Sequence, residues 1–158
     1  MNIVAREVVE KYSNMLMQIA YQRTFNKSDS EDIVQDAFIK LIKNSNKIKD
    51  EEHLKYWLIK VTINLCNDYN KSFWNKNTTE LNEELSQFDE EQTLIFKEIN
   101  KLKPVYRDVI YLYYYQGYKI KEISIILKMK ENTVSSNLTR AREKLKVILE
   151  EGGEINVK

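Results

Sequence analysis

The sequence predicts an all-α fold of two small helical domains joined by an acidic, flexible linker. Three glycines and one proline among 158 residues are too few for the frequent turns of a β fold. Apolar residues make up 42% of the chain, an ordinary share for a globular protein, and they recur at helical spacing in several segments. A polar, acidic stretch at 75–94 interrupts this periodicity, so we expect domains at 1–74 and 95–150 and a tail at 151–158.

The first domain is expected to hold three or four helices. The first has apolar residues at helical spacing from Val8 to Ala20, and the second begins in "NKSDSED" with Ser28 or Ser30 as its N-cap. A polar loop is predicted at 43–53, before the helix "LKYWLIKVTINLCNDY". The side chains expected to face the core are Val34, Ala37, Phe38 and Leu41, followed by Leu54, Trp57, Leu58, Val61, Leu65 and Tyr69. Cys66, the one cysteine, is expected to be a buried structural thiol.

The second domain is expected to hold four helices. The first is "EQTLIFKEINKL", and Pro104 suits the first turn of the next, which Gly117 should end. "KIKEISIILK" is predicted as a short helix, followed by a turn and the helix "KENTVSSNLTRAREKLKVIL".

The last predicted helix is amphipathic. Spacings of four and three place Val134, Leu138 and Ala141 on one face, with Leu145 and Ile148 continuing it. A short helix, a tight turn and a longer helix of this kind are typical of a helix-turn-helix, whose second helix enters the DNA major groove. The side chains placed to meet duplex DNA are Ser135, Ser136, Thr139, Arg140 and Arg142. A helical hairpin with an ordinary basic outer face is the alternative.

Charge is distributed unevenly along the chain. The formal net charge is +1, but residues 76–100 carry 2 basic and 7 acidic side chains, and residues 101–158 carry 12 and 7. A basic block after an acidic stretch favours a module that meets a polyanion, although two ordinary solvated surfaces would look the same. No apolar run approaches the ~20 residues of a membrane span and no signal peptide is evident, so we expect a cytoplasmic protein without membrane insertion.

Two separate blocks resemble bacterial RNA polymerase sigma factors of the extracytoplasmic-function (ECF) group. "KENTVSSNLTRAREKL" is similar to the last helix of their C-terminal domain, and "SDSEDIVQDAFIKLIK" with "YWLIKVTINLCNDY" is similar to their N-terminal domain. Three positions depart from the family pattern, which has glycine where Lys128 and Asn132 stand and arginine at Asn137. Lysine tolerates left-handed backbone poorly, so we expect the turn at 128 to follow a somewhat different path.

The resemblance implies partners and roles. It implies binding of core RNA polymerase through Asp32, Gln35 and Asp36. It implies capture of melted promoter DNA by a second set of side chains, Lys60, Asn64 and Asn67. It also implies recognition of upstream duplex promoter DNA by the C-terminal helix and, by analogy, control by an anti-sigma factor.

Two other classes of function are the alternatives. A stand-alone helix-turn-helix regulator would bind duplex DNA without engaging polymerase, and it would need a dimerisation face instead of the "SDSEDIVQDAF" surface. An enzyme is disfavoured because the chain has one histidine, His53, and neither a phosphate loop nor paired metal ligands in its sequence. No cofactor and no metal site are expected.

Overall fold

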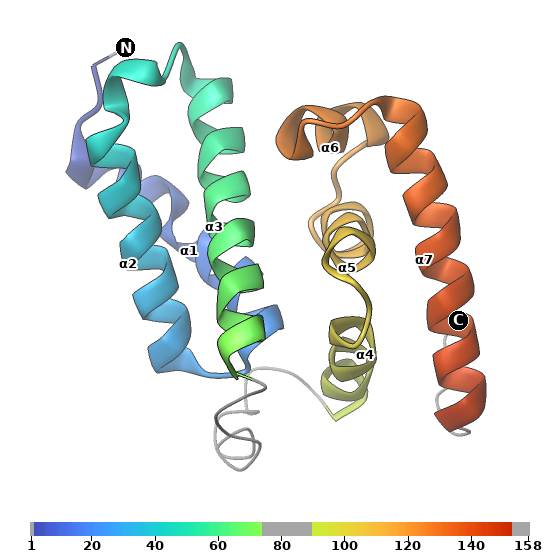
Figure 1. The fold of residues 1–158 in the computed structure, drawn as a ribbon. Helices are drawn as coiled ribbons and strands as arrows, with labels where there is room; N and C mark the ends of the chain where they lie inside the picture. Colours follow the sequence, from blue (N-terminus) through green and yellow to red (C-terminus); the bar gives the residue numbers. More distant parts are fainter. Residues whose placement is uncertain (1, 74–89, 153–158) are drawn as a thin grey trace. The chain divides into compact units, whose positions relative to one another are not determined.

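The computed structural model describes residues 2–73 and 90–152, which form helices in two compact units (Figure 1). No strand occurs in the described ranges, and the all-α expectation is confirmed. Residues 74–89, which include most of the linker predicted at 75–94, and the end of the chain from 153 lie outside the described residues.

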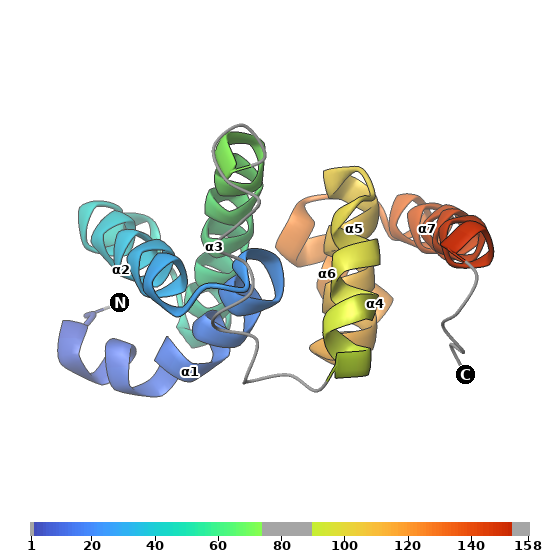
Figure 2. The ribbon, with the colours of Figure 1, turned by 90° about the horizontal axis from the view of Figure 1, so that it is seen from below.

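The first unit is a bundle of α1 (Ala5–Thr24), α2 (Lys27–Lys43) and α3 (Glu51–Phe73), with a 3₁₀ turn, η1 (Ser45–Lys47), after α2. Each of the three helices packs against the other two, and Figure 2 shows α1 lying across one side of the pair formed by α2 and α3. Large side chains that are fully buried form the centre of this core: Leu16, Leu41, Leu54, Leu58 and Ile59. Cys66 is also buried, as predicted.

The start of α2 differs from the prediction. Asn26, and neither Ser28 nor Ser30, is the N-cap, because the Asn26 side chain accepts a hydrogen bond from the Asp29 backbone N–H at 2.9 Å. Ser30 lies within the first turn and is fully buried, where its hydroxyl meets that of Thr24 at 2.7 Å. The buried hydroxyl pair therefore joins α1 to α2 instead of capping the helix.

The inward face of α3 is also rotated from the prediction. Leu54 and Leu58 are buried as expected, but Trp57, Val61, Leu65 and Tyr69 are only partly buried. The positions that the bundle buries instead are Tyr56, Ile59, Thr62, Ile63 and Cys66. α3 is apolar around much of its circumference, so its orientation depends on contacts with α1 and α2. The predicted loop at 43–53 is shorter, because α3 begins at Glu51 and the Asp50 carboxylate accepts from the His53 backbone N–H at 2.8 Å.

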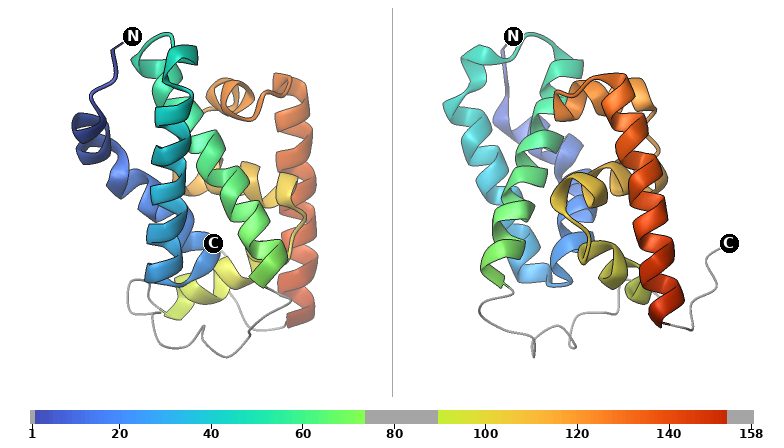
Figure 3. Two further views of the ribbon diagram at one scale, coloured as in Figure 1. Left: turned by 60° about the vertical axis from the view of Figure 1, so that its left-hand side comes forward. Right: turned by 45° about the vertical axis from the view of Figure 1, so that its right-hand side comes forward.

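The second unit contains α4 (Glu90–Asn100), α5 (Pro104–Ile110), the π-helical turn η4 (Tyr111–Tyr115), α6 (Ile120–Leu127) and α7 (Glu131–Gly152). α7 packs against α4, α5 and α6, and the right-hand view of Figure 3 shows the tight turn between α6 and α7. Pro104 occupies the first turn of α5 as predicted. α7 continues to Gly152, two residues beyond the expected end of the domain.

Two residues with left-handed backbone set the turns on either side of α6. Gly117, at φ +74°, follows η4 and allows the chain to reverse there, as predicted. Lys128 ends α6 at φ 55° and ψ 49°. Lysine therefore adopts at this position the left-handed conformation that it tolerates poorly, at a steric cost of roughly 1–2 kcal/mol.

Candidate nucleic-acid interface

The helix-turn-helix is formed by α6, the turn at Lys128–Lys130 and α7. Val134, Leu138 and Ala141 are at most 1% exposed and bind α7 to the unit, as the sequence predicted. Leu145 and Ile148 are only half-buried. All five side chains expected to meet duplex DNA lie on the exposed part of α7: Ser135, Ser136, Thr139, Arg140 and Arg142.

Short hydroxyls occupy the N-terminal half of the exposed α7 surface. The Thr139 hydroxyl donates to the Ser135 backbone carbonyl at 3.1 Å. Its lone pairs and its methyl group therefore remain available to an approaching molecule. Ser135 and Ser136 keep hydroxyls that can donate or accept, so this surface can meet both donors and acceptors on base edges.

The cations of α7 have different surroundings. The Arg142 guanidinium donates through Nη1 to the Tyr114 hydroxyl of η4 at 2.7 Å. Lys144 lies over the Tyr106 ring, 5.5 Å from its centroid, so it faces α5. Arg140 is exposed. Arg140 and Arg142 are thus the two arginines of this helix that flank the hydroxyl-bearing surface.

The two residues of α7 that depart from the family pattern, Asn132 and Asn137, lie in different environments. Asn137 is 9% exposed, and its amide lies 3.9 Å from the Met129 sulfur, so this side chain faces the turn and not the outer surface. Asn132 lies in the first turn of α7 and is exposed. Asn137 therefore supports the turn of the helix-turn-helix. Asparagine in place of the family's arginine at this position does not change the hydroxyls and arginines of the outer surface.

A second candidate surface lies on α2. The side chains of Asp32, Gln35 and Asp36 are exposed and make no hydrogen bond or ion pair within the described part of the chain. Two large apolar side chains follow on the same helix, Ile39 at 43% and Ile42 at 60% exposure. Positions 32, 35, 36 and 39 share one helical face, so carboxylates, an amide and apolar groups form one continuous surface. Sequence reasoning found the polar members and missed the two isoleucines.

The predicted single-strand residues of α3 fall into two groups. Asn64 is exposed and Lys60 is partly exposed, one helical turn apart. Asn67 is half-buried, and its amide oxygen accepts a hydrogen bond from Arg23 of α1. Lys60 and Asn64 therefore lie together on the surface, whereas the Asn67 amide oxygen is engaged within the bundle. Trp57 is one turn before Lys60 and is partly exposed, contrary to the core position predicted for it.

An ion-pair cluster joins the N-terminal half of α1 to the first turn of α3. Glu51 Oε1 lies 2.7 Å from Lys11 Nζ and also accepts from the Tyr12 hydroxyl. The hydrogen bond from Lys11 lowers the pKa of Glu51 and raises the pKa of Lys11. Burial is the main reason why the pKa of Tyr12 is raised. These shifts belong to a structural contact and lie apart from the α2 and α7 surfaces.

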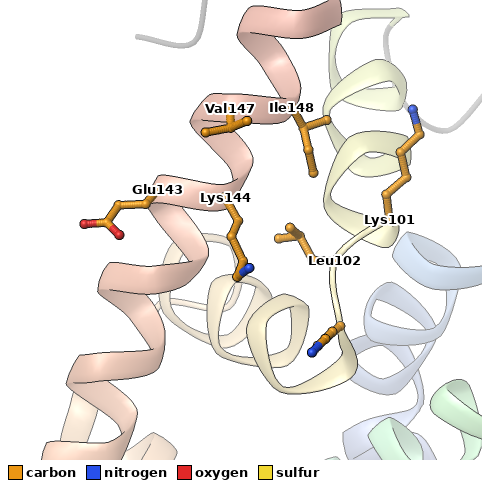
Figure 4. Close-up of a pocket in the computed structure, with 7 residues that line it drawn as sticks. Lys101, Leu102, Glu143, Lys144, Val147 and Ile148 are labelled. Atoms are coloured by element: carbon orange, nitrogen blue, oxygen red, sulfur yellow. The ribbon is translucent and has the colours of Figure 1, made fainter.

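A groove of about 440 Å³ lies between the α4–α5 junction and the C-terminal half of α7. Figure 4 shows Leu102 and Ile148 pointing into it, with Lys101 and Lys144 at its sides. Lys103, Glu143 and Val147 complete its lining. The groove combines apolar side chains with a mainly basic rim.

Two further features bear on the class of protein. Within residues 2–73 and 90–152, no helix is long and apolar enough to cross a membrane. The same ranges contain no cluster of three or more histidine, cysteine or acidic side chains arranged to hold a metal ion.

The fold and its surfaces define a two-unit, all-helical DNA-binding protein with a helix-turn-helix in its second unit. Residues 8–74 match the family model "Sigma-70 region 2", and residues 93–145 match "Sigma-70, region 4". The chain belongs to the sigma-70 family and is an RNA polymerase sigma factor of the ECF group. Proteins of this family are transcription initiation factors.

Similar proteins agree with this assignment. The chain is 26% identical to the ECF RNA polymerase sigma factor SigM of Bacillus subtilis, across 92% of this chain and 95% of SigM. It is also 26% identical to SigW of the same organism, across 89% and 86%. Among solved structures, CnrH in complex with the cytosolic domain of CnrY has a TM-score of 0.71 at 21% identity, across 93% of this chain and 88% of that one. RpoE of Bartonella quintana in complex with the anti-sigma factor NepR has a TM-score of 0.64 at 21% identity, across 92% and 96%.

Proposed function

We propose that residues 1–74 bind core RNA polymerase and hold melted promoter DNA, and that residues 95–150 bind the upstream promoter element as duplex. The observation that carries this assignment is the separation of surfaces: an acidic and apolar face on α2, an amide and lysine face on α3, and a hydroxyl and arginine face on α7. Each surface has the chemistry that its proposed partner requires.

The α2 face suits a protein partner. Asp32 and Asp36 can form charge-assisted hydrogen bonds with a basic helix, and these would orient the complex. Ile39 and Ile42 would provide apolar contact area, which an interface needs at its centre. Gln35 can both donate and accept between the two carboxylates.

The α3 face suits unpaired bases. Asn64 can hydrogen-bond the Watson–Crick edge of an extruded base, and Lys60 one turn away can meet its phosphate. Asn67 stays in this proposal with a narrower role, because its amide oxygen already accepts a hydrogen bond from Arg23 of α1.

The α7 face suits the major groove of duplex DNA. Ser135, Ser136 and Thr139 can approach base edges closely, while Arg140 and Arg142 can reach guanine or phosphate oxygens. Because this work is done with core polymerase on chromosomal DNA, we propose that the protein acts in the cytoplasm, as an initiation factor without enzymatic activity of its own.

An anti-sigma partner is proposed by analogy with the CnrH–CnrY and RpoE–NepR complexes. We expect such a partner to bind by covering apolar surface of this chain. The partly exposed side chains Trp57, Val61 and Leu65 of α3 and the groove beside α7 offer that surface in the two units.

Co-elution with bacterial core polymerase at moderate salt tests the proposal. The variant is the double charge reversal Asp32→Lys with Asp36→Lys, and the control is Glu7→Lys with Glu10→Lys, which changes the net charge equally on exposed positions of α1. We expect the wild type and the control to co-elute and the variant to be lost from the complex. A wild-type chain that binds duplex DNA but fails to bind core polymerase would instead be a stand-alone regulator.

A further inference from the structure

Tyr114 of η4 and Arg142 of α7 are 28 residues apart in sequence, yet their side chains form a 2.7 Å hydrogen bond. Arg142 is exposed, and Tyr114 is 48% exposed, so the pair lies at the protein surface. Arg142 comes three residues after Thr139 and seven after Ser135, which places it on the same side of α7 as these two hydroxyls. The pair therefore borders the surface proposed to enter the major groove.

The direction of this hydrogen bond leaves donors free at both partners. A guanidinium has five N–H donors and no acceptor, so Arg142 donates and the Tyr114 oxygen accepts. The phenol proton of Tyr114 then remains available to a third group, and the adjacent positive charge makes it a stronger donor. Because four further N–H groups of Arg142 also remain, a single anion can receive bonds from both side chains.

The π-helical turn holds Tyr114 in this position. The Gln116 backbone N–H donates to the Tyr111 carbonyl five residues earlier, at 2.9 Å, which accommodates one residue more than an α-helical turn would. Tyr111 and Tyr115 pack against Phe96, with ring centroids at 5.8 and 4.9 Å. The Tyr113 ring lies edge-to-face against Tyr114 at 5.0 Å. The tyrosine run at 111–115 thus orients one hydroxyl toward α7.

We propose that Tyr114 and Arg142 form a phosphodiester-binding site at the edge of the α7 surface, where both donate to one phosphate of the DNA backbone. This inference rests on the proposed function, since it assigns a ligand at the border of the same duplex-binding surface. The two side chains act as one unit: Tyr114 holds the Arg142 guanidinium in place before DNA arrives, and the adjacent guanidinium charge strengthens the phenol donor. Lys144 has no part in this site, because it faces the Tyr106 ring on the other flank of α7.

Salt-dependent DNA binding tests the site. The probe is a set of 30-base-pair duplexes selected from a random-sequence library by the wild-type chain assembled with core polymerase. Affinity is measured for that assembly against salt concentration, with wild type, Tyr114→Phe, Arg142→Ala and the double variant. Tyr113→Phe is the matched control, since it removes a hydroxyl from the neighbouring exposed tyrosine and leaves both rings.

We expect Tyr114→Phe to weaken binding about fivefold, the loss of roughly one hydrogen bond to a charged partner at an exposed site. Arg142→Ala should lower the slope of log affinity against log salt concentration by about 0.9, which corresponds to the loss of one phosphate contact. Tyr114→Phe should lower this slope part of the way, and it should have little further effect once Arg142 is alanine. Tyr113→Phe should match wild type.

Two results would overturn the site while leaving the proposed function intact: wild-type affinity and slope in Tyr114→Phe, or full additivity in the double variant. A merely structural role for Tyr114 would weaken binding without changing the salt slope, which also overturns the inference. If the wild-type assembly selects no duplex at all, the proposed function fails together with this site.

Discussion

The Lys11 ammonium of α1 lies 2.7 Å from the Glu51 carboxylate in the first turn of α3, and this contact joins the two helices. The hydrogen bond from Lys11 lowers the pKa of Glu51 below 4.5 and raises the pKa of Lys11 above 10.5. A lowered carboxyl pKa stabilises the fold above the unfolded value and ceases to do so as the pH falls through the folded value. A raised ammonium pKa acts at the other end, so the contact contributes fully between about pH 4.5 and pH 10.5.

The first prediction concerns this pH window. Glu51→Gln should lower the free energy of unfolding at pH 7, and the difference from wild type should shrink as the pH is lowered below 4.5. Urea unfolding followed by circular dichroism at several pH values measures this. Glu52→Gln is the control, because Glu52 has the same place in the helix dipole and is exposed. If the loss of stability caused by Glu51→Gln does not depend on pH, the ion pair does not have this role.

The second prediction concerns the start of α2. Asn26→Ala should destabilise the protein by about 1 kcal/mol, because it removes the side chain that accepts from the Asp29 N–H. Ser28→Ala, at an exposed position in the first turn, should change the free energy of unfolding by at most a few tenths of a kcal/mol. If urea unfolding shows an equal loss of stability for the two variants, Ser28 is the N-cap, as the sequence suggested.

The third prediction concerns the turn of the helix-turn-helix. Lys128→Gly should raise the free energy of unfolding by about 1 kcal/mol, since glycine adopts φ 55° without the clash of a Cβ atom. Lys128→Ala keeps that Cβ atom and should bring no gain. Thermal unfolding of both variants separates relief of backbone strain from simple removal of the lysine side chain. Stabilisation by alanine as well as glycine would show that the side chain, and not the backbone, was unfavourable.

The fourth prediction concerns the apolar part of the α2 face. Ile39→Ser and Ile42→Ser should each weaken binding to core polymerase by about tenfold, a moderate loss for an interface side chain. Val9→Ser, at a similarly exposed position of α1, should leave affinity unchanged. Affinity can be measured by competition with labelled wild-type protein for core polymerase. Unchanged binding in both isoleucine variants would restrict the interface to the polar residues.

Much of the second unit followed from local pattern. Val134, Leu138 and Ala141 repeat at spacings of four and three in a helix with a single apolar face, so the buried side of α7 could be identified without knowing its neighbours. Exposure of Ser135, Ser136 and Thr139 followed from the same spacing. Pro104 and Gly117 act through backbone properties that are equally local.

Other features depended on contacts that no local pattern contains. α3 is apolar on several sides, so the packing of α1 and α2 decided that Ile59 and Ile63 are buried while Trp57 and Val61 are partly exposed. The hydrogen bond between Arg142 and Tyr114 depended on a π-helical turn that brings η4 beside α7. The sequence by itself determined the helices, the amphipathic face of α7 and the family, because these reside in short-range spacing and composition. Only the tertiary structure decided which face of α3 turns inward and which tyrosine meets an arginine, because both depend on residues distant in the chain.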